Sequence, residues 1–320
     1  MMDQPSVSPV LSLSHVSKRF GDFCAVDDIS LSIPQGSIYG FLGPNGAGKT
    51  TTIRMILDII KPDSGEVSIL GEDSALKVRN RIGYLPEEKG LYKKMKVWAI
   101  IQYFAMLKGM DKQAAKDRAF ELLEQYGLKE FAEAKVESLS KGMGQKVQVL
   151  SAVAHNPELV ILDEPFSGLD PVNQSVLEEL IHQLSDNGQT VVFSTHVMQH
   201  AERLCDHILL ITRGQKIFDG TLAEARACIP RRVLLETADS VDSVGSLSGV
   251  TSITAVDGET ESTQWQVEIA ESLNPQEILK HCFNAQISLS RFEFVEPSLH
   301  DVFVHLVGDE AADKDKVEAA

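Results

Sequence analysis

The stretch Gly43-Pro44-Asn45-Gly46-Ala47-Gly48-Lys49-Thr50, continued by Thr51, decides the fold of this chain. It meets the pattern G-x-x-x-x-G-K-[ST], whose glycines let backbone N–H groups approach phosphates closely. An apolar run over residues 37–42 precedes it, and apolar residues on one helical face, at positions 53, 56, 57 and 60, follow it. The positive end of that helix would point at the same phosphates. The stretch therefore predicts an α/β nucleotide site, where Lys49 contacts the β- and γ-phosphates and the Thr50 hydroxyl binds Mg²⁺.

The composition argues against several classes of protein. The 320 residues carry a formal net charge of -16, which disfavours nucleic acid as a partner because binding to its phosphates needs basic side chains. No apolar run approaches the roughly 18 residues of a membrane span. The first 14 residues lack the basic start and apolar core of a signal peptide. The four cysteines show no CxxC spacing, so we expect free thiols in a reducing cytosol.

Two acidic residues and a histidine follow predicted buried strands over 159–163 and 190–195. Asp163 at the first strand tip can hold Mg²⁺ through water, and Glu164 can act as the general base for an attacking water. His196 follows the second strand, at the sheet edge where open α/β folds bind ligands, and can contact the γ-phosphate. The alternatives are an acidic pair without function at a strand end and a metal pair formed by His196 and His200.

The remaining periodicity divides the chain into two domains. The first covers 13–227 after a lead-in over 1–12. It has strands over 10–16, 29–33 and 37–42, a turn at 62–65, a helical subdomain at about 88–155 with helical periodicity over 97–126, and a hairpin over 207–212 and 216–219. The second, over 231–307, has the strand–helix–strand–strand–helix–strand order of a ferredoxin-like α+β domain, with strands near 233–237, 250–257, 263–270 and 287–295 and a final helix over 299–307. Residues 308–320 are predicted to be a disordered tail.

The motifs, taken in this order, resemble the ATP-binding subunits of ABC transporters over about residues 10–225. Residues 43–50 match the Walker A motif, 159–164 the Walker B motif, 167–170 the D-loop with Asp170, and His196 the switch histidine. Residues 139–143 occupy the position of the signature motif. Phe20 matches the aromatic residue that stacks on adenine. The resemblance implies an α/β P-loop NTPase fold of the ABC type, with a mixed sheet, a helical subdomain and ATP and Mg²⁺ as cofactors.

Two departures from the family pattern concern site residues. The signature LSGGQ reads Leu139-Ser140-Lys141-Gly142-Met143 here, so Ser140 and Gly142 are retained while Lys141 and Met143 are replacements. Glu87 stands where the family has a glutamine, and can meet Mg²⁺ or the attacking water as a charged group. Both departures resemble the branch of bacterial ATPases that serves sodium and drug exporters. The domain over 231–307, which ends in the segment 296–303, resembles the C-terminal extension of that branch.

The resemblance also implies partners and a location. Two chains, as a homodimer or a pair of related ATPase subunits, would enclose two ATP molecules, with the signature of one chain covering the ATP of the other. Hydrolysis would loosen this dimer, and a separate transmembrane permease would respond to the change. The resemblance therefore places the protein in the cytoplasm, on the inner face of the cell membrane. Residues 83–97 would carry the permease contact through Lys89, Lys93, Lys94 and Lys96, unless these lysines form only a solvated charge cluster.

Three other functions are open. A soluble ABC-class ATPase that is not coupled to transport is disfavoured by the single ATPase unit and the lack of a heptad run. A P-loop kinase or GTPase of another class would not explain the signature, Asp170 and His196 together. A non-hydrolysing regulator is disfavoured by Glu164. The direction of transport rests on the family resemblance alone.

Overall fold

The structure is a computed structural model that describes residues 9–88, 90–256, 263–270 and 272–318, without the side chains of 263 and 309–318. Lys89 therefore lies outside the described residues. The chain divides into two compact units, residues 1–221 and 222–320. Helix α7 (Leu222–Ala227), which the sequence places in the first domain, belongs to the second unit, where it packs against α9 (Leu299–Glu318).

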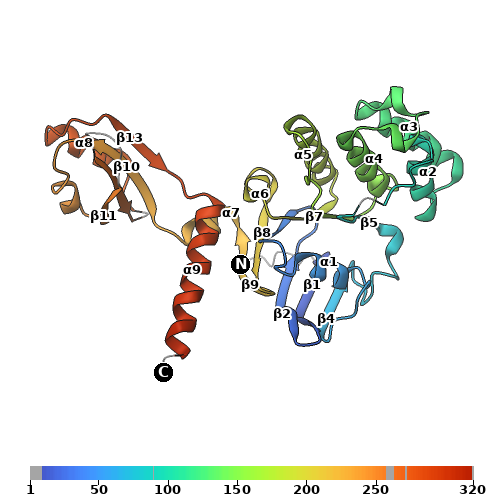
Figure 1. The fold of residues 1–320 in the computed structure, drawn as a ribbon, viewed down its shortest axis with the longest axis horizontal. Coiled ribbons are helices and arrows are strands. Elements are labelled where there is room, and N and C mark those ends of the chain that lie inside the picture. The colour runs from blue at the N-terminus through green and yellow to red at the C-terminus, as the bar shows by residue number, and fades with distance from the viewer. Residues whose placement is uncertain (1–8, 89, 257–262, 271, 319–320) are drawn as a thin grey trace, which may run out of the picture. The chain divides into compact units, whose positions relative to one another are not determined.

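A six-stranded sheet forms the centre of the first unit, in the order β5-β6-β7-β3-β8-β9. Its strands are β3 (Ile38–Leu42), β5 (Ile82–Leu85), β6 (Leu159–Asp163), β7 (Thr190–Thr195), β8 (His207–Thr212) and β9 (Gln215–Thr221). The pairing is parallel except between β8 and β9, the predicted hairpin. Every residue of β3, β6 and β7 is buried, as expected for apolar runs covered on both faces. Figure 1 shows α5 (Pro171–Asp186) and α6 (Met198–Leu204) on one side of this sheet.

A second sheet in this unit is antiparallel and has the order β2-β1-β4, so the unit contains both parallel and antiparallel strands. Its strands are β1 (Leu11–Phe20), β2 (Phe23–Ile33) and β4 (Ser64–Ile69), and the first two are longer than predicted. The turn predicted at 62–65 gives way at Ser64 to β4, whose first residue pairs with Ser17 of β1. Helix α1 (Lys49–Ile56) buries Ile53 and Ile56 in the core that joins the two sheets.

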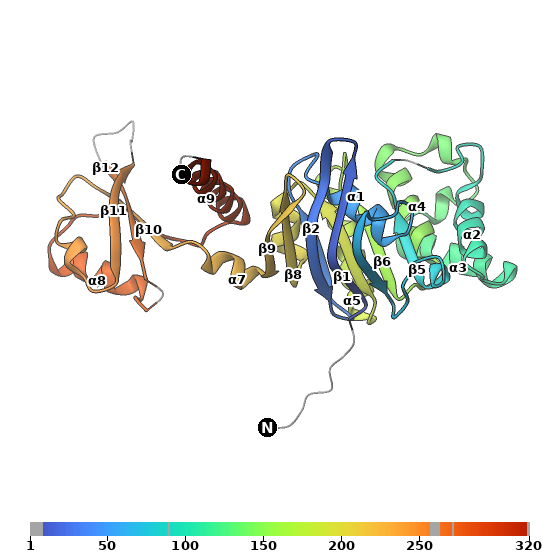
Figure 2. The ribbon, with the colours of Figure 1, turned by 90° about the horizontal axis from the view of Figure 1, so that it is seen from below.

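The predicted helical subdomain contains α2 (Val97–Leu107), α3 (Lys112–Gln125) and α4 (Lys141–Val153), which Figure 2 shows together at one end of the unit. The Asp111 carboxylate caps α3 by accepting hydrogen bonds from the N–H groups of Gln113 and Ala114. Leu107, at the end of α2, is 61% exposed. Among the described residues, no helix has both the length and the apolar character that a bilayer span requires.

The second unit is a four-stranded antiparallel sheet in the order β11-β12-β10-β13. Its strands are β10 (Arg231–Thr237), β11 (Val250–Val256), β12 (Thr263–Ile269) and β13 (Arg291–Val295). Numbered along this domain, the order is 2-3-1-4, which is that of a ferredoxin-like sheet. Helix α8 (Pro275–Asn284) buries Ile278 and Cys282 against it.

Two predictions for this unit differ from the structure. The first predicted helix is only a 3₁₀ turn, Val244–Ser246, because the serines, aspartates and glycine around it favour turns over helix. The predicted final helix continues as α9 to Glu318, so residues 308–318 are helical where a disordered tail was expected. Alanine, lysine and glutamate in this stretch are good helix formers.

Candidate active site

The phosphate loop connects β3 to α1, and its backbone geometry requires glycine. Gly43 has φ 151° and Gly48 has φ 107°, a region that side chains rarely tolerate. A Cβ atom on Gly43 would lie 2.0 Å from the carbonyl oxygen of Ile211, and one on Gly48 would lie 2.5 Å from that of Ala25. The loop is therefore packed directly against the backbone of neighbouring strands, which leaves room for no other residue at these two positions.

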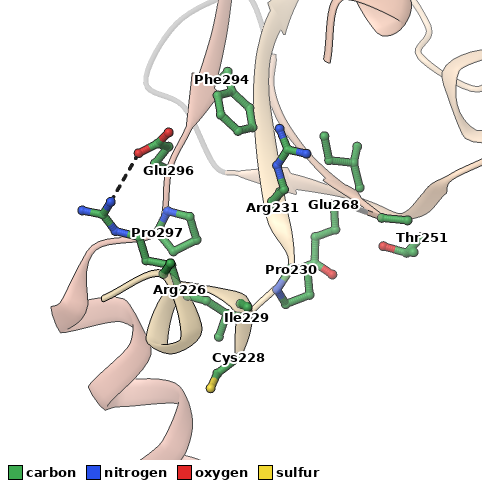
Figure 3. Close-up of a pocket in the computed structure, with 14 residues that line it drawn as sticks. Arg226, Cys228, Ile229, Pro230, Arg231, Thr251, Glu268, Phe294, Glu296 and Pro297 are labelled. Carbon is green, nitrogen blue, oxygen red and sulfur yellow. Dashed lines mark ion pairs between the residues drawn. The ribbon is translucent and has the colours of Figure 1, made fainter. Parts of the chain in front are cut away.

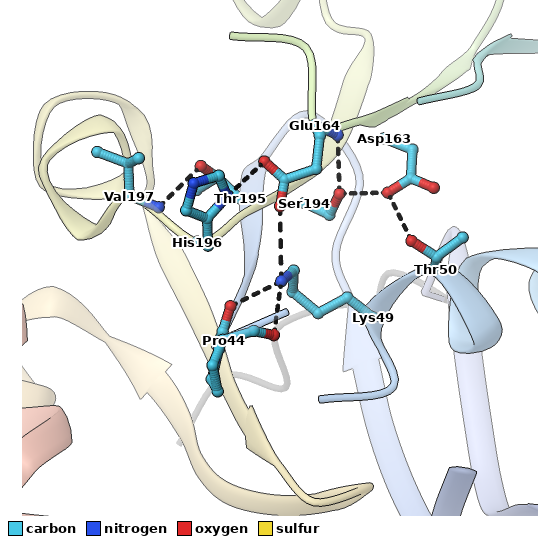
Figure 4. Close-up of polar contacts among 10 residues, drawn as sticks. Pro44, Lys49, Thr50, Asp163, Glu164, Ser194, Thr195, His196 and Val197 are labelled. Carbon is cyan, nitrogen blue, oxygen red and sulfur yellow. Dashed lines mark hydrogen bonds and ion pairs between the residues drawn. The ribbon is translucent and has the colours of Figure 1, made fainter. Parts of the chain in front are cut away.

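Lys49 lies at the first position of α1 and its side chain is only 6% exposed. Its Nζ donates hydrogen bonds to the carbonyl oxygens of Gly43 at 2.6 Å and Pro44 at 3.1 Å. The same Nζ lies 3.5 Å from Glu164 Oε1. The ammonium group therefore sits inside the curve of the loop, where the structure brings it next to the predicted base (Figure 4).

Asp163 and Thr50 meet as predicted for a magnesium site. The Thr50 hydroxyl donates to Asp163 Oδ1 at 3.2 Å, and Asp163 Oδ2 is buried without a hydrogen-bond partner among the described residues. Mg²⁺ prefers oxygen ligands and commonly uses one or two carboxylates together with substrate phosphates. A buried carboxylate oxygen without a hydrogen-bond partner, beside a hydroxyl, fits this ion. Glu87 lines the same cavity.

Ser194 of β7 organises both acidic residues, and sequence reasoning missed it. Its hydroxyl donates to Asp163 Oδ1 at 2.5 Å and accepts a hydrogen bond from the Glu164 backbone N–H at 2.9 Å (Figure 4). Ser194 is fully buried. Nothing in the sequence around it distinguishes it from other serines, because its partners come from the neighbouring strand.

Glu164 and His196, each predicted to be catalytic, lie in contact and form a candidate catalytic pair. His196 Nδ1 lies 3.0 Å from Glu164 Oε2, while the Glu164 side chain is 9% exposed. Glu164 has φ 48°, which is uncommon for a residue other than glycine and costs roughly 1–3 kcal/mol. Strain of this size persists only where the surroundings hold it. The carboxylate is thus fixed between an imidazole and the Lys49 ammonium.

Lys49, Thr50 and Glu164 line a cavity of about 360 Å³. Its lining consists of Phe23, Ala25, Asn45, Gly46, Ala47, Gly48, Lys49, Thr50, Thr51, Glu87 and Glu164. The structure therefore brings together most of the predicted nucleotide-binding residues. Phe20 is not among the described lining residues and is 52% exposed, whereas Phe23, its cross-strand partner, lines the cavity. The aromatic pattern on the two sides of the Gly21-Asp22 turn could not decide which ring faces the ligand.

Comparisons with known proteins agree with this geometry. Residues 26–167 match the ABC transporter family, and residues 220–307 match the C-terminal domain of DrrA1-3-like ATP-binding proteins. An uncharacterized ABC transporter ATP-binding protein, YhaQ of Bacillus subtilis (strain 168), is 41% identical over 301 residues, which cover 93% of this chain and 99% of the relative. The chain belongs to the ABC transporter ATP-binding proteins.

Two further relatives of this ABC ATPase carry more informative names. Nod factor export ATP-binding protein I of Burkholderia orbicola (strain AU 1054) is 39% identical and covers 67% of this chain and 71% of its own. A dimeric post-hydrolysis structure of the ATP-binding cassette MJ0796, bound to ADP and phosphate, has a TM-score of 0.61 at 27% identity. It covers 66% of this chain and 98% of its own. The predicted fold class and family are confirmed, and a kinase or GTPase of another class is excluded.

The signature and the D-loop of this ABC ATPase lie side by side in one chain. The Ser140 hydroxyl accepts a hydrogen bond from the Met143 N–H at 3.2 Å and caps α4. A Cβ on Gly142 would lie 2.5 Å from the Asn173 side-chain nitrogen, and one on Gly168 would lie 1.9 Å from Lys141 Nζ. The closely packed Asn173 amide in turn contacts Asp170. None of residues 140–143 is among the described lining of the phosphate-loop cavity.

Asp170 caps α5 rather than contacting the phosphate loop of its own chain. Its Oδ1 accepts the Asn173 N–H at 3.0 Å, and this hydrogen bond is the main reason that the pKa of Asp170 is lowered. The carboxylate is fully exposed, at the start of the helix whose first turn it holds. The D-loop prediction is therefore compatible with a contact outside this chain.

The ABC ATPase has a second, larger cavity of about 790 Å³ in its C-terminal unit (Figure 3). Arg226 Nη1 lies 3.6 Å from Glu296 Oε2 at one wall, and the Arg231 guanidinium lies 4.8 Å from the ring centroid of Phe294 at another. No glycine-rich loop contributes to the described lining. The size of a cavity therefore does not identify the candidate nucleotide site. The phosphate loop, Lys49 and Glu164 in the lining of the smaller cavity indicate it.

Proposed function

We propose that this ABC ATPase hydrolyses ATP at a site completed by a second chain and thereby powers export through a separate membrane permease. The observation that carries the proposal is the convergence of Lys49, Glu164 and His196 within 3.5 Å contacts at the phosphate loop. Hydrolysis adds water to the γ-phosphorus and breaks its bond to the bridging oxygen, which yields ADP and phosphate. Glu164 accepts a proton from the attacking water. Lys49 and His196 then face the charge of the γ-phosphate.

The proposed magnesium ligands are Thr50, Asp163 and Glu87. When bound with ATP, Mg²⁺ would neutralise charge on the phosphate oxygens. The Thr50 hydroxyl lies 3.2 Å from the Asp163 carboxylate, so the two oxygens are close enough to bind one ion. Glu87 reaches the cavity from the segment after β5 and is exposed, so it can approach the ion or the attacking water.

The proposed dimer follows from the position of the signature. Ser140 is exposed at the start of α4, where the helix N-terminus favours an anion, yet it does not line its own chain's cavity. A second chain, identical or closely related, would present its signature and Asp170 to this cavity. The dimeric relative bound to ADP and phosphate supports this arrangement.

The test is Glu164→Gln, which keeps the shape of the side chain and removes the base. We expect turnover to fall by about 100-fold or more, while ATP binding stays within a few-fold of wild type and an ATP-dependent dimer accumulates. Glu158→Gln, at the residue before the same strand, is the control, because Glu158 pairs with Arg81 at 2.6 Å on the surface. Full ATPase activity in Glu164→Gln would remove Glu164 as the base.

The proposed permease contact is a groove of about 400 Å³ beside Lys93 and Lys94. It is lined by Tyr84, Leu85, Pro86, Gly90, Leu91, Phe104, Leu107, Lys108, Gln148, Ser151 and Ala152. Lys96 pairs with Glu133 at 2.6 Å, so of the described lysines of this segment Lys93 and Lys94 are the ones left for an acidic partner. A cytoplasmic loop of the permease with acidic residues would fit here. It would hold the protein on the inner face of the membrane.

Charge reversal tests this contact. The double variant Lys93→Glu, Lys94→Glu should lose co-purification with the membrane subunit while keeping its ATPase activity. Lys112→Glu, at an exposed lysine of the same unit, is the control. Unchanged co-purification of the Lys93 and Lys94 variant would assign the lysines to a solvated cluster.

A further inference from the structure

His200 lies directly behind the catalytic pair, on the helix that starts just after His196. Its side chain is 5% exposed. Its ring stacks on the ring of Phe166, with centroids 4.2 Å apart and planes 16° from parallel. Phe166 follows Glu164 by two positions and meets Phe193 of β7 edge-on at 5.8 Å. Phe166, in the segment that follows the predicted base, therefore packs against His200.

The imidazole also contacts the helix that starts at the D-loop. His200 Nδ1 lies 3.5 Å from Glu178 Oε1 on α5, and Arg203 Nε lies 3.5 Å from the same oxygen. Neither His200 Nδ1 nor Glu178 Oε1 forms a hydrogen bond with good geometry among the described residues. Burial lowers the pKa of His200, and the nearby Glu178 opposes this shift. An apolar side chain at position 200 would leave Glu178 Oε1 with the Arg203 contact alone of these two.

The two contacts act on both members of the catalytic pair. Glu164 has φ 48°, so its backbone conformation depends on the packing that follows it, which begins with Phe166. His196 lies four positions before His200, and the Val197 N–H donates to Thr195 Oγ1 at 3.1 Å where the chain enters α6. A shift of α6 would therefore move His196, and a shift of Phe166 would move Glu164.

We propose that His200, which stacks on Phe166 and lies beside Glu178, is a positioning residue that fixes Glu164 and His196 relative to each other. The inference rests on the proposed function of Glu164 as the base. His200 is not among the described residues that line the phosphate-loop cavity, so it acts through its neighbours. Glu178 lies on the helix that Asp170 caps, so the same contact joins the D-loop helix to α6, the helix that follows His196.

The test separates positioning from a merely structural role. His200→Ala removes both contacts, and His200→Phe keeps a ring on Phe166 while removing the contact with Glu178. We expect kcat in His200→Ala to fall about 10- to 100-fold, since small misplacements of reacting groups cost this much, with KM for ATP within about threefold of wild type. His200→Phe should recover part of this loss, and Glu178→Gln should reduce kcat about as much as His200→Phe does.

The ATPase assay that gives kcat for the His200 variants also provides the control and the results that would contradict the inference. His182→Ala, an exposed histidine on α5, should leave kcat unchanged. Wild-type kcat in His200→Ala, or a kcat loss that His200→Phe does not recover at all, overturns the inference. Glu164→Gln is measured alongside. If it is inactive while His200→Ala is fully active, only this inference fails. If Glu164→Gln is active, the proposed function itself fails.

Discussion

Replacing Ser194 with alanine should weaken the first unit and its magnesium dependence together. The Ser194 hydroxyl donates to Asp163 Oδ1 at 2.5 Å and accepts from the Glu164 N–H at 2.9 Å. Alanine leaves the buried N–H without its acceptor, which costs about 1–3 kcal/mol, and removes a hydrogen bond to a carboxylate worth about 1.5–3 kcal/mol. We therefore expect a loss of about 2.5–6 kcal/mol in the free energy of unfolding. Among the described residues, the Asp163 carboxylate would keep its hydrogen bond from Thr50.

The assay can be confined to the unit that holds the site. Trp98 lies in the first unit and Trp265 in the second, and they are the only two tryptophans of the chain. In a Trp265→Phe background, urea unfolding followed by tryptophan fluorescence reports the first unit alone. The ATPase rate is then titrated with Mg²⁺, and Ser194→Ala should need about 10-fold more metal, the usual result of losing a group that orients a metal ligand.

A second buried serine provides the control. The Ser151 hydroxyl donates only to the Val147 carbonyl oxygen one turn earlier in α4, at 2.7 Å. Ser151→Ala should cost about 1 kcal/mol or less and leave the Mg²⁺ titration unchanged. If Ser194→Ala matches Ser151→Ala in both measurements, the contacts around Asp163 do not hold the site as described.

Three other measurements check separate parts of the site and the fold. Phe23→Ala should weaken ATP binding about 10-fold in calorimetry, because the adenine would lose an aromatic ring to stack on. Phe20→Ala should have little effect on this affinity. The reverse result would place the adenine on Phe20, as the family resemblance predicts. Lys49→Ala should bind ATP far more weakly than wild type, and unchanged affinity would mean that the loop is not the site. Burial lowers the pKa of His155 from 6.5 to about 4, so the unfolded chain takes up its proton first and stability should fall as the pH drops from 6.5 towards 4. His155→Gln should flatten this part of the urea-unfolding profile, and an identical pH dependence in both proteins would contradict the assignment.

The parts of the fold that could be predicted are those whose signals are local. Patterns of consecutive residues predict the phosphate loop, the strand before it and the helix after it. The same holds for the buried strands β6 and β7. The strand β4 could not be predicted, because its polar start at Ser64 becomes a strand only by pairing with β1. The four-residue β5 is equally dependent on its neighbour, β6.

The site shows the same division between local and tertiary information. Asp163, Glu164 and His196 follow strands whose ends meet at one sheet edge, so their proximity was predictable. Ser194 and His200 act through residues on other elements, and no spacing along the chain connects them to Glu164. Phe20 and Phe23 pair across one hairpin, and only the placement of that hairpin against the loop distinguishes them.

The absence of residues 140–143 from the described lining of their own chain's phosphate-loop cavity has a genetic consequence. Residues 140–143 are outside the described lining of that cavity, so each site of the proposed homodimer combines parts of two polypeptides. Lys49→Ala and Ser140→Ala would each inactivate both sites when present alone. In a cell that expresses both alleles, mixed dimers hold one site with an intact Lys49 from one chain and an intact Ser140 from the other. Two loss-of-function alleles of a single gene would then complement each other.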